Sequence, residues 1–565
     1  KGYEINPTLR KDYDELFDEL RLQDMVPQNI VHLWCVTREN QGESGSMEKH
    51  QSGGFYSLLF LGQALGRQYG ETRFYLKVVS NHMQEVTGEE VLHPGKAALL
   101  GPVKVIGQEY PNISCQSIDI DVSDLESRNS RETRDRLLAE LTTRSSDTMI
   151  AYRGKYRWVQ TFHPFRLPSG EKVQTGMREK GVYLITGGLG GIGLLFAEHF
   201  AKKARARLIL TGRSALPPRH AWEQWLADHA AEDGVGLKIR NILALETLGA
   251  EVLVLSADAA DQRQMQEAVI QAKERFGTIH GVIHAAGITG GASFCAIEET
   301  TEEACREQFR PKIQGTMVLE SVLEGTDLDF CILMSSLSSV LGGLQFVSYA
   351  AANLFMDAFV SRHNRGNNVP WISVNWDGWQ LDDQHTDPST ATSAGAKIAE
   401  LTLTPEEGMA AFQSILSLVG KTNQIVVSTS DLQKRIEQWI RMDPLEEQPC
   451  SEKSGLSSSH KRPTLSSVYM EPRTDIERKM THIWENVLGL SPVGVQDNFF
   501  ELGGHSLLGT QVISRLRQTF QVEINIRNLF DEPTVAGLSE RIEKIRFENQ
   551  NRRSGVPEER EEIVL

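Results

Sequence analysis

The stretch that decides the fold is Val182-Tyr183-Leu184-Ile185-Thr186-Gly187-Gly188-Leu189-Gly190-Gly191-Ile192-Gly193. Its first four residues form a short uncharged run typical of a buried parallel strand, and residues 194–203 have helical composition. The glycines between them let the backbone turn tightly and approach a pyrophosphate, while the helix amino terminus supplies free N–H groups. A tight turn without a ligand is the alternative, but the strand–turn–helix context favours a dinucleotide site. The predicted contacts are Thr186, Gly187, Gly188, Leu189, Gly190, Gly191, Ile192 and Gly193.

The next strands along the chain end in small or polar residues on the same side of the predicted sheet. Residues 207–210 form a strand that leads into Arg213, where NAD-binding sites usually carry an acid for the ribose hydroxyls. A planar guanidinium suits a 2′-phosphate instead, so we expect NADPH. Residues 251–255 and 281–283 are the next two strands. The predicted contacts at these strand ends are Arg213, Ser214, Asp258, Ala259, His284, Ala285, Ala286 and Gly287.

A second informative stretch runs from Ser336 to Asn353. The apolar run 330–334 precedes it like a buried strand, and Tyr349 begins a segment of helical composition. Ser336 should therefore lie where a strand ends, with Tyr349 and Asn353 one helical turn apart on a common face. A hydroxyl and a phenol placed in this way form two donors that can hold a carbonyl oxygen while hydride attacks its carbon. A polar loop followed by a helix with a core tyrosine is the alternative.

Composition sets the wider limits. A chain of 565 residues should fold as three or four units, and 40% hydrophobic with 24% charged residues is typical of globular domains. The net charge of -16 argues against nucleic acid as a partner, and no apolar run reaches transmembrane length. Six cysteines without a CxxC pair indicate reduced thiols in the cytoplasm, and we predict no metal site. A start at Lys1, with no signal peptide, suggests a piece of a longer chain.

The first part of the chain, residues 1–178, has no glycine loop. Strands are expected at 30–36, 72–79 and 113–122, alternating with helices such as 54–65, which implies an α/β layer fold. The residues after its first strand cannot cradle a pyrophosphate with their backbone. We therefore predict a companion domain rather than a second active site. The hairpin-like stretch 150–162, with Tyr156 and Trp158, is expected to pack it on the following domain.

The last part of the chain begins with a linker, residues 441–472, rich in Ser, Pro, Glu and Lys. Residues 473–545 contain three amphipathic segments and predict a small helical bundle, followed by a tail at 546–565. Before the second segment, glycines precede Ser506. A hydroxyl at a helix start favours an attached phosphodiester, and a plain N-cap serine is the alternative.

These features resemble the short-chain dehydrogenase/reductase superfamily and, within it, the ketoreductase domains of modular polyketide synthases. The resemblance covers about residues 1–440, because such ketoreductases carry a truncated, cofactor-free Rossmann-like subdomain before the catalytic one. It implies a structural subdomain at 1–178 and a catalytic Rossmann subdomain at 179–440. Ordinary superfamily members have a Lys four residues after the Tyr, whereas synthase ketoreductases take it from an earlier helix. The resemblance implies a catalytic tetrad of Lys312, Ser336, Tyr349 and Asn353, with Ser336 preferred to Ser335 on spacing alone.

The resemblance also implies a role for each member of the tetrad. A free tyrosine has a pKa of about 10, and the Lys312 ammonium is expected to lower the pKa of Tyr349 toward neutrality and to hold the nicotinamide ribose. Tyr349 donates the proton, Ser336 shares the charge on oxygen, and Asn353 positions Lys312 or a water. For Lys312, an exposed surface position is the alternative. Trp376 and Trp379, beside the polar stretch 381–399, suit either a lid or a core.

The segment around Ser506 resembles the attachment site of phosphopantetheine carriers, so Ser506 is expected to bear 4′-phosphopantetheine. His505 stands where polyketide carriers usually have Asp and is closer to peptidyl carriers. Residues 473–545 would then be a small four-helix carrier bundle. The expected partners are a phosphopantetheinyl transferase, the tethered acyl chain, and upstream and downstream synthase domains such as ketosynthase, acyltransferase or adenylation-type modules.

The resulting hypothesis is a ketoreductase–carrier didomain of a polyketide or mixed polyketide/peptide synthase, in which NADPH reduces a carrier-bound 3-oxoacyl thioester. Reduction of a 2-oxoacyl thioester in a depsipeptide-forming module and a silent reductase serving as scaffold are the alternatives; a free-standing dehydrogenase does not explain Ser506. Ketoreductases giving the D-alcohol commonly carry Leu-Asp-Asp where residues 288–291 read Ile-Thr-Gly-Gly. The L-alcohol is therefore favoured, although Leu341 replaces the Trp that often marks that class.

Overall fold

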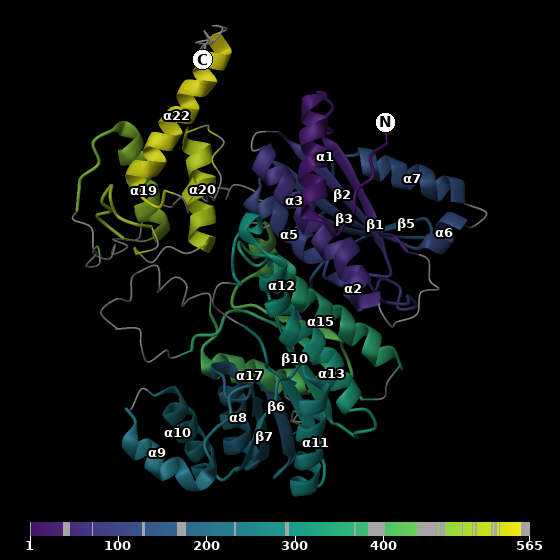
Figure 1. Cartoon of the computed structure of the whole chain (residues 1–565), viewed down its shortest axis with the longest axis vertical. Helices are drawn as coiled ribbons and strands as arrows, with labels where there is room; N and C mark the ends of the chain where they lie inside the picture. Colours follow the sequence, from purple (N-terminus) through teal and green to yellow (C-terminus); the bar gives the residue numbers. More distant parts are fainter. Residues whose placement is uncertain are drawn as a thin grey trace, which may run out of the picture. The chain divides into compact units, whose positions relative to one another are not determined.

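The structure is a computed structural model. It describes residues 2–37, 46–69, 72–126, 130–165, 177–230, 233–288, 293–366, 369–381, 402–437, 462, 469–488, 490–499, 501–502, 506–520, 522, 524, 528–529 and 532–554. A larger compact unit contains two β-sheets and extends to about Arg441, and a smaller unit contains the C-terminal helices (Figure 1). Within the described residues, no helix has the length and apolarity needed to cross a bilayer.

The second sheet carries the predicted nucleotide site. Its seven strands are all parallel and lie in the order β12-β11-β10-β9-β6-β7-β8. The chain leaves β6 in one direction to build β7 and β8 and returns to its other side with β9, so the strand order reverses between β6 and β9. Ligands of open α/β sheets bind outside the carboxyl ends of the strands at such a switch point. The strands are β6 (Val182–Thr186), β7 (Arg207–Gly212), β8 (Glu251–Ser256), β9 (Gly281–His284), β10 (Phe330–Ser336), β11 (Trp371–Trp376) and β12 (Gln424–Val427).

Helices cover both faces of this sheet. In Figure 1, α8 and α17 lie on one side of β6, β7 and β10, and α11, α13 and α15 on the other. On the first side, aromatic residues of α8 and α17 pack on Tyr183 and Phe330 in one apolar cluster. The predicted helix after the glycine turn is α8, and the helix that begins near Tyr349 is α15. The helices of this sheet include α8 (Gly191–Ala204), α9 (Trp222–Asp228), α10 (Gly234–Thr247), α11 (Gln262–Phe276), α12 (Glu302–Phe309), α13 (Gly315–Val322), α14 (Ser338–Leu341), α15 (Val347–Gly366), α17 (Pro405–Leu416) and α18 (Leu432–Ile436), with the π-helical turn η4 (Arg310–Gln314).

The first sheet has the α/β architecture expected of a companion domain. Its strands lie in the order β1-β2-β3-β4-β5, and the first four are parallel. They are β1 (Asn29–Cys35), β2 (Phe74–Asn81), β3 (Ile113–Ile120), β4 (Met149–Arg153) and β5 (Tyr156–Val159). The helices and helical turns include α1 (Arg10–Leu22), α2 (Ser46–His50), η1 (Gln51–Tyr56), α3 (Ser57–Gln68), α4 (Pro94–Ala97), α5 (Leu100–Glu109), α6 (Val122–Glu126) and α7 (Ser130–Thr142).

The hairpin expected at 150–162 is present, but its two aromatic side chains do not pack as predicted. β5 pairs antiparallel with β4 at the edge of the sheet, where Tyr156 and Trp158 are 58% and 43% exposed. All four residues of β5 are exposed at this edge of the sheet, so both rings lie in solvent. Phe162 of the same stretch does reach the catalytic half, where it packs against Leu337, Val340 and Leu341.

The smaller unit contains α19 (Asp475–Leu488), α20 (Ser506–Phe520) and α22 (Val535–Ser554). These helices match the three predicted amphipathic segments, and α22 extends beyond residue 545. Trp484 of α19 is fully buried and packs edge-on against Phe499. Arg462, inside the predicted linker, forms a bidentate pair with Asp497, a carboxylate with no exposed surface. All three helices contribute buried apolar side chains to the core of this unit.

Candidate active site

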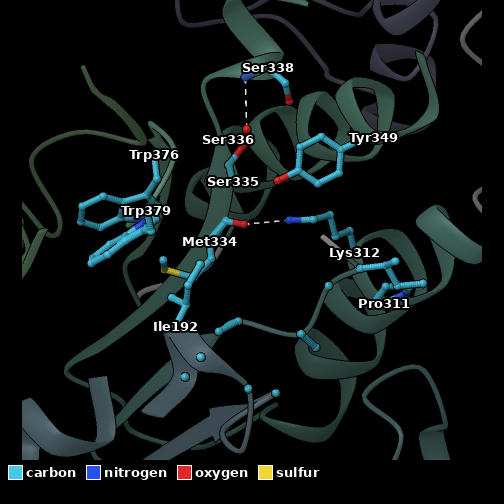
Figure 2. Close-up of a pocket in the computed structure, with 18 of the residues that line it drawn as sticks. Ile192, Pro311, Lys312, Met334, Ser335, Ser336, Ser338, Tyr349, Trp376 and Trp379 are labelled. Carbon is cyan, nitrogen blue, oxygen red and sulfur yellow. Dashed lines mark hydrogen bonds between the residues drawn. The ribbon is translucent and has the colours of Figure 1, made fainter. Parts of the chain in front are cut away.

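A cavity of about 1080 Å³ lies at the carboxyl ends of the second sheet. The turn after β6, the ends of β7, β9 and β10, and the start of α15 all contribute to its wall. This is the position that the switch in strand order predicts for a ligand. One end of the cavity is lined by the glycine turn, and the other contains the hydroxyl-bearing residues (Figure 2).

The turn after β6 depends on glycine at two positions. Gly187 has a φ of +67°, and a side chain there would place Cβ 2.9 Å from Ala285 O. A Cβ on Gly193 would contact Gly187 O and lie 2.8 Å from Gly188 Cα. Both approaches are closer than real Cβ contacts allow. The turn thereby presents the uncapped amino terminus of α8 to the cavity, an arrangement that fits the pyrophosphate of a dinucleotide.

Most of the predicted cofactor contacts line this cavity, and five do not. Those on the wall are Gly187, Gly190, Gly191, Ile192, Gly193, Arg213, Asp258, Ala259, Ala285, Ala286 and Gly287. Those away from the wall are Thr186, Gly188, Leu189, Ser214 and His284. Arg213 is exposed at the rim. Asp258 accepts hydrogen bonds from Arg310 Nε and Nη2 at 3.2 and 3.1 Å, so a second guanidinium also lies beside the predicted adenosine end.

His284 has a different place from the one predicted. Its ring is buried at the end of β9, where Nε2 lies 2.9 Å from Pro311 O and Nδ1 2.7 Å from Thr186 Oγ1. A carbonyl only accepts, so Nε2 carries the proton and Nδ1 accepts from the Thr186 hydroxyl. Burial lowers the pKa of His284 to about 3, which keeps the ring neutral. His284 therefore joins β6 to the turn that carries Lys312.

Three of the four predicted tetrad residues, Lys312, Ser336 and Tyr349, line the other end of the cavity, whereas Asn353 is fully buried and does not line it. Ser336 is the last residue of β10, while Tyr349 and Asn353 lie one turn apart on α15. Figure 2 shows the Tyr349 hydroxyl directed toward Ser336, with the Lys312 side chain reaching in from the opposite wall. Lys312 Nζ lies 5.4 Å from the centre of the Tyr349 ring. A phenol, a hydroxyl and an ammonium thus surround one space large enough for a carbonyl group.

Family models match three parts of the chain. Residues 181–381 match the KR domain model, and residues 478–542 match the model of the phosphopantetheine attachment site. Residues 1–140 match a model described as beta-ketoacyl synthase-like, N-terminal.

Known proteins agree with these matches. The chain is 30% identical over 409 residues to polyketide synthase PksM of Bacillus subtilis (strain 168), which corresponds to 71% of this chain and 9% of PksM. An N-terminal ketoreductase from the macrolactin assembly line superposes with a TM-score of 0.60 and 27% identity, over 77% of this chain and 80% of that one. A ketoreductase domain from the bacillaene assembly line superposes with a TM-score of 0.55 and 27% identity, over 71% of this chain and 88% of that one. This chain carries a polyketide-synthase ketoreductase domain followed by a phosphopantetheine carrier domain.

The comparisons also bear on the extent of the ketoreductase. The chain spans about a tenth of the length of the first curated relatives it matches. Residues 181–565 make up about two thirds of the chain, so a structural match over 77% includes part of the first sheet. The cofactors that go with the two domain families, NADPH for polyketide ketoreductases and 4′-phosphopantetheine for the carrier, are those expected from the sequence.

The electrostatics of the four predicted tetrad residues differ in one respect from the expectation. Burial raises the pKa of Tyr349 above its ordinary value, and hydrogen bonds with Ser336 and Asn353 oppose this only in part. The expected lowering by Lys312 is therefore not the dominant effect. Burial also lowers the pKa of Lys312 to about 8, against the opposite influence of the Asp357 carboxylate. At neutral pH the phenol keeps its proton, which suits a group that must donate it.

Lys312 and Asn353 are both buried but are not bonded to each other. Lys312 Nζ donates to Met334 O at 2.9 Å (Figure 2), and the side chain is 5% exposed. Asn353 Nδ2 donates to Tyr349 O at 2.9 Å. Its Oδ1 has no hydrogen-bond partner within the described part of the chain. A buried acceptor without a partner costs about 1–3 kcal/mol, so it fits a position that receives a donor from a bound group or a water.

Ser336, the serine predicted from the spacing, and its neighbour Ser335 have different surroundings. Ser336 Oγ accepts from Ser338 N at 3.2 Å and is close enough to Tyr349 to lower the pKa of its phenol. Ser335 Oγ accepts from Asn375 Nδ2 at 3.0 Å, in a buried polar network behind the strand. Both serines line the cavity, but the Ser335 hydroxyl is bonded into that network, and Ser336 is the one that lowers the pKa of Tyr349.

Part of the cavity wall was not predicted from the sequence. The rings of Phe294 and Phe346 lie 5.4 and 5.5 Å from that of Tyr349 and form an apolar wall around the phenol. Asp377, just after β11, pairs with the buried Arg435 of α18 on the same wall. Phe346 is close enough in sequence to Tyr349 to be suspected, but nothing in the sequence links residues 377 and 435.

Trp376 and Trp379 line the cavity and also belong to the core. Trp376 is 3% exposed, and Trp379 packs on Phe196 of α8. The structure therefore gives these rings the packing role that was one of the two expectations. The stretch 381–399 proposed as a lid lies outside the described residues except for Leu381. Of the stereochemical marker at 288–291, only Ile288 is described.

In the carrier domain, Ser506 is the first residue of α20. The amino end of a helix of this length favours a negatively charged group such as a phosphodiester. Gly503, Gly504 and His505, which precede it, lie outside the described residues. The five cysteines that the structure describes are free thiols.

Proposed function

We propose that this chain reduces a 3-oxoacyl thioester, tethered to its carrier domain, to the 3-hydroxyacyl thioester with NADPH. One observation supports this most: a phenol, a hydroxyl and a buried ammonium surround the end of a cavity whose other end is a glycine turn. The same chain carries a phosphopantetheine attachment domain to deliver the substrate. The same proposal makes this chain part of one module of a longer synthase that acts in the cytoplasm. Its partners there would be neighbouring ketosynthase, acyltransferase or adenylation-type domains and a phosphopantetheinyl transferase.

Each residue of the tetrad has a role that its surroundings support. NADPH, when bound on the glycine turn, supplies the hydride that adds to the ketone carbon. Tyr349 gives its phenolic proton to the ketone oxygen, and the Ser336 hydroxyl donates a hydrogen bond to that oxygen as charge develops. Lys312 stabilises the phenolate that remains and directs its further N–H groups into the cavity. The free Oδ1 of Asn353 accepts from a group that returns a proton to this site.

Arg213 is proposed to set the choice of cofactor. It lies on the cavity wall after β7, where a planar cation can bind the 2′-phosphate that distinguishes NADPH from NADH. Arg213→Ala should raise the KM for NADPH by about tenfold, the worth of one charge-assisted contact. The KM for NADH should stay within twofold. Equal effects on both cofactors would contradict the assignment.

The alternative substrate is a 2-oxoacyl thioester, which the peptidyl-carrier character of His505-Ser506 favours. A silent reductase is the other alternative, and the intact set of four tetrad residues argues against it. The absence of Leu-Asp-Asp at residues 288–291 favours the L-alcohol as product. Chiral analysis of the released 3-hydroxy acid tests this, and a D-product would contradict it.

The decisive experiment measures the intact mass of the full chain after loading. A phosphopantetheinyl transferase attaches the arm with either a 3-oxoacyl or a 2-oxoacyl group, and NADPH is then added. We expect a gain of two hydrogens on the 3-oxo form only. Ser506→Ala should accept no arm, and a variant that still gains its mass would show that Ser506 is not the site. A mass gain of two hydrogens on the 2-oxo form alone would favour the depsipeptide alternative. No mass gain on either form would favour the silent reductase that serves as a scaffold.

A further inference from the structure

We propose that Gln108, in the cofactor-free first sheet, is a positioning residue that fixes the substrate wall of the ketoreductase cavity. The inference rests on the proposed function, because it assigns to Gln108 control over how the acyl chain lies beside Tyr349. The side chain belongs to α5 and is 8% exposed. Its amide binds the segment that connects Ser336 to Tyr349.

The amide of Gln108 contacts this segment through both of its ends. Nε2 donates to Leu341 O at 2.6 Å, and Oε1 accepts from Gly343 N at 2.8 Å. The donor and acceptor therefore pair with the backbone on both sides of Gly342, much as a neighbouring strand would. Two hydrogen bonds from one planar group fix both the position and the orientation of the segment.

The segment needs such a contact because its own sequence does not restrict the backbone to one conformation. Gly342 and Gly343 have φ values of +73° and +133°, which residues with side chains rarely adopt. A Cβ on Gly342 would lie 2.9 Å from Gln108 Oε1, so glycine is required for the amide to approach. Glycines lose more conformational freedom on ordering than other residues. An external hydrogen-bonding partner is what selects one conformation here.

The base of the contact is rigid. Lys104, one turn earlier on α5, donates from Nζ to Val340 O at 3.1 Å. Further along the same helix, a Cβ on Gly101 would lie 2.6 Å from Val347 O and 2.7 Å from Ala351 Cβ, so α5 packs directly on α15. The helix that presents Gln108 is therefore fixed against the helix that carries Tyr349.

The position of this segment matters for the substrate and not for the cofactor. Leu341, Gly342, Gly343 and Phe346 line the cavity, and the Phe346 ring lies 5.5 Å from that of Tyr349. The glycine turn and Arg213 belong to other strand ends of the cavity. A shift of the segment should therefore change which face of the ketone meets the hydride while leaving NADPH binding intact.

The chain offers a matched control in Gln63 of α3. Its Nε2 donates to Ile297 O and Thr300 O at 2.7 and 2.9 Å, so it also joins the first sheet to the catalytic half through a fully buried amide. Neither Ile297 nor Thr300 lines the cavity. A variant of Gln63 thus removes a similar contact between the halves without touching the substrate wall.

The experiment compares the full-length wild type with Gln108→Ala, Gln108→Met and Gln63→Ala, using a 3-oxoacyl thioester of N-acetylcysteamine and NADPH. Gln108→Met keeps the packing volume and guards against a simple loss of folding. For both Gln108 variants we expect a KM for the thioester about tenfold higher and a minor alcohol isomer several times more abundant. The KM for NADPH should stay within twofold. Gln63→Ala should change neither the thioester KM nor the isomer ratio.

Hydrogen exchange provides a readout that does not depend on turnover. The Gly343 amide should exchange at least tenfold faster in both Gln108 variants than in the wild type. In Gln63→Ala its exchange rate should be the same as in the wild type. A wild type that fails to reduce the thioester overturns the proposed function, while the exchange result still decides whether Gln108 fixes the segment. Equal exchange in all four proteins, or an unaltered thioester KM and isomer ratio in active Gln108 variants, overturns the inference.

Discussion

The two sheets of the larger unit share a parallel α/β architecture but differ at the carboxyl ends of their strands. In the second sheet, a glycine turn leaves room for a ligand, and a cavity of about 1080 Å³ opens there. In the first sheet, the corresponding edge is occupied by side chains of the protein. Lys96 is fully buried there, and Arg153 pairs with the buried Asp119. The same strand arrangement therefore becomes a binding site or a scaffold according to the residues at the ends of its strands.

The two sheets also differ in how each uses the donors of a buried lysine. Burial lowers the pKa of both Lys96 and Lys312 to about 8. Lys96 Nζ donates to Asn81 Oδ1, Thr37 Oγ1 and Asn81 O at 2.6, 2.8 and 3.1 Å, so its donors are used within the chain. Among the described residues, Lys312 Nζ has a single acceptor, Met334 O. A lysine with satisfied donors stabilises a fold, and one with spare donors can act on a ligand.

The largest effect should come from the phenol of the second sheet. Tyr349→Phe removes the proposed proton donor while keeping the ring between Phe294 and Phe346. Reduction should fall by about 10²–10⁴-fold, the usual contribution of a general acid. NADPH binding, followed by fluorescence titration, and thermal stability should remain close to wild type. A variant that keeps most of its activity would mean that another group supplies the proton.

The glycine turn should be the next most sensitive feature. Gly193→Ala forces Cβ against Gly187 O and should weaken NADPH binding by about 10²-fold, because a clash of this kind costs a few kcal/mol. Gly53→Ala, in the turn η1 that comes after β1 of the first sheet, is the matched control. Its Cβ would lie 3.6 Å from Trp34 O, an ordinary contact. Isothermal titration of both variants should show NADPH affinity reduced only in Gly193→Ala; equal affinities would mean that the turn does not form the site.

Replacement of the two lysines by methionine should separate stability from function. Lys96→Met leaves Thr37 and Asn81 without their donor and should lower the free energy of unfolding by about 1–3 kcal/mol, with reduction unchanged. Lys312→Met removes a buried charge with one acceptor and should lower the free energy of unfolding by less than about 1 kcal/mol, while reduction is lost. Denaturant unfolding and turnover assays test both. The opposite pattern would contradict the roles assigned to the two donor sets.

The elements of both sheets could be predicted from sequence because apolar runs and the glycine turn are local signals. Which side chains reach the cavity could not. Thr186 and His284 end neighbouring strands, as predicted, yet they face each other beneath the site. The position of Lys312 came only from a family resemblance, since nothing local links it to Tyr349. Gln108 was invisible for the same reason: its partners lie more than 230 residues away.

The smallest expected effect concerns the pH dependence of reduction. Asp357 is 7% exposed and accepts from Ser373 Oγ at 2.5 Å and from Asn375 Nδ2 at 2.7 Å. Its charge raises the pKa of Lys312, in opposition to burial, which brings that pKa to about 8. If reduction requires the ammonium, activity is present below this pH and is lost as the pH rises through about 8.

Asp357→Asn removes the charge that raises the Lys312 pKa, so the alkaline limb of the kcat/KM profile should move to lower pH. Ser373→Ala is the control, because it removes a hydrogen bond to Asp357 and leaves the carboxylate charge in place. Profiles measured from pH 6 to pH 10 should show a displaced limb only for Asp357→Asn, whatever the variants lose in absolute rate. If the alkaline limb lies at the same pH in both variants, the Asp357 carboxyl is neutral in this range, because burial also raises the pKa of Asp357. In that case the pKa of Lys312 depends on burial alone, and the second sheet's lysine differs from the first only in its spare donors.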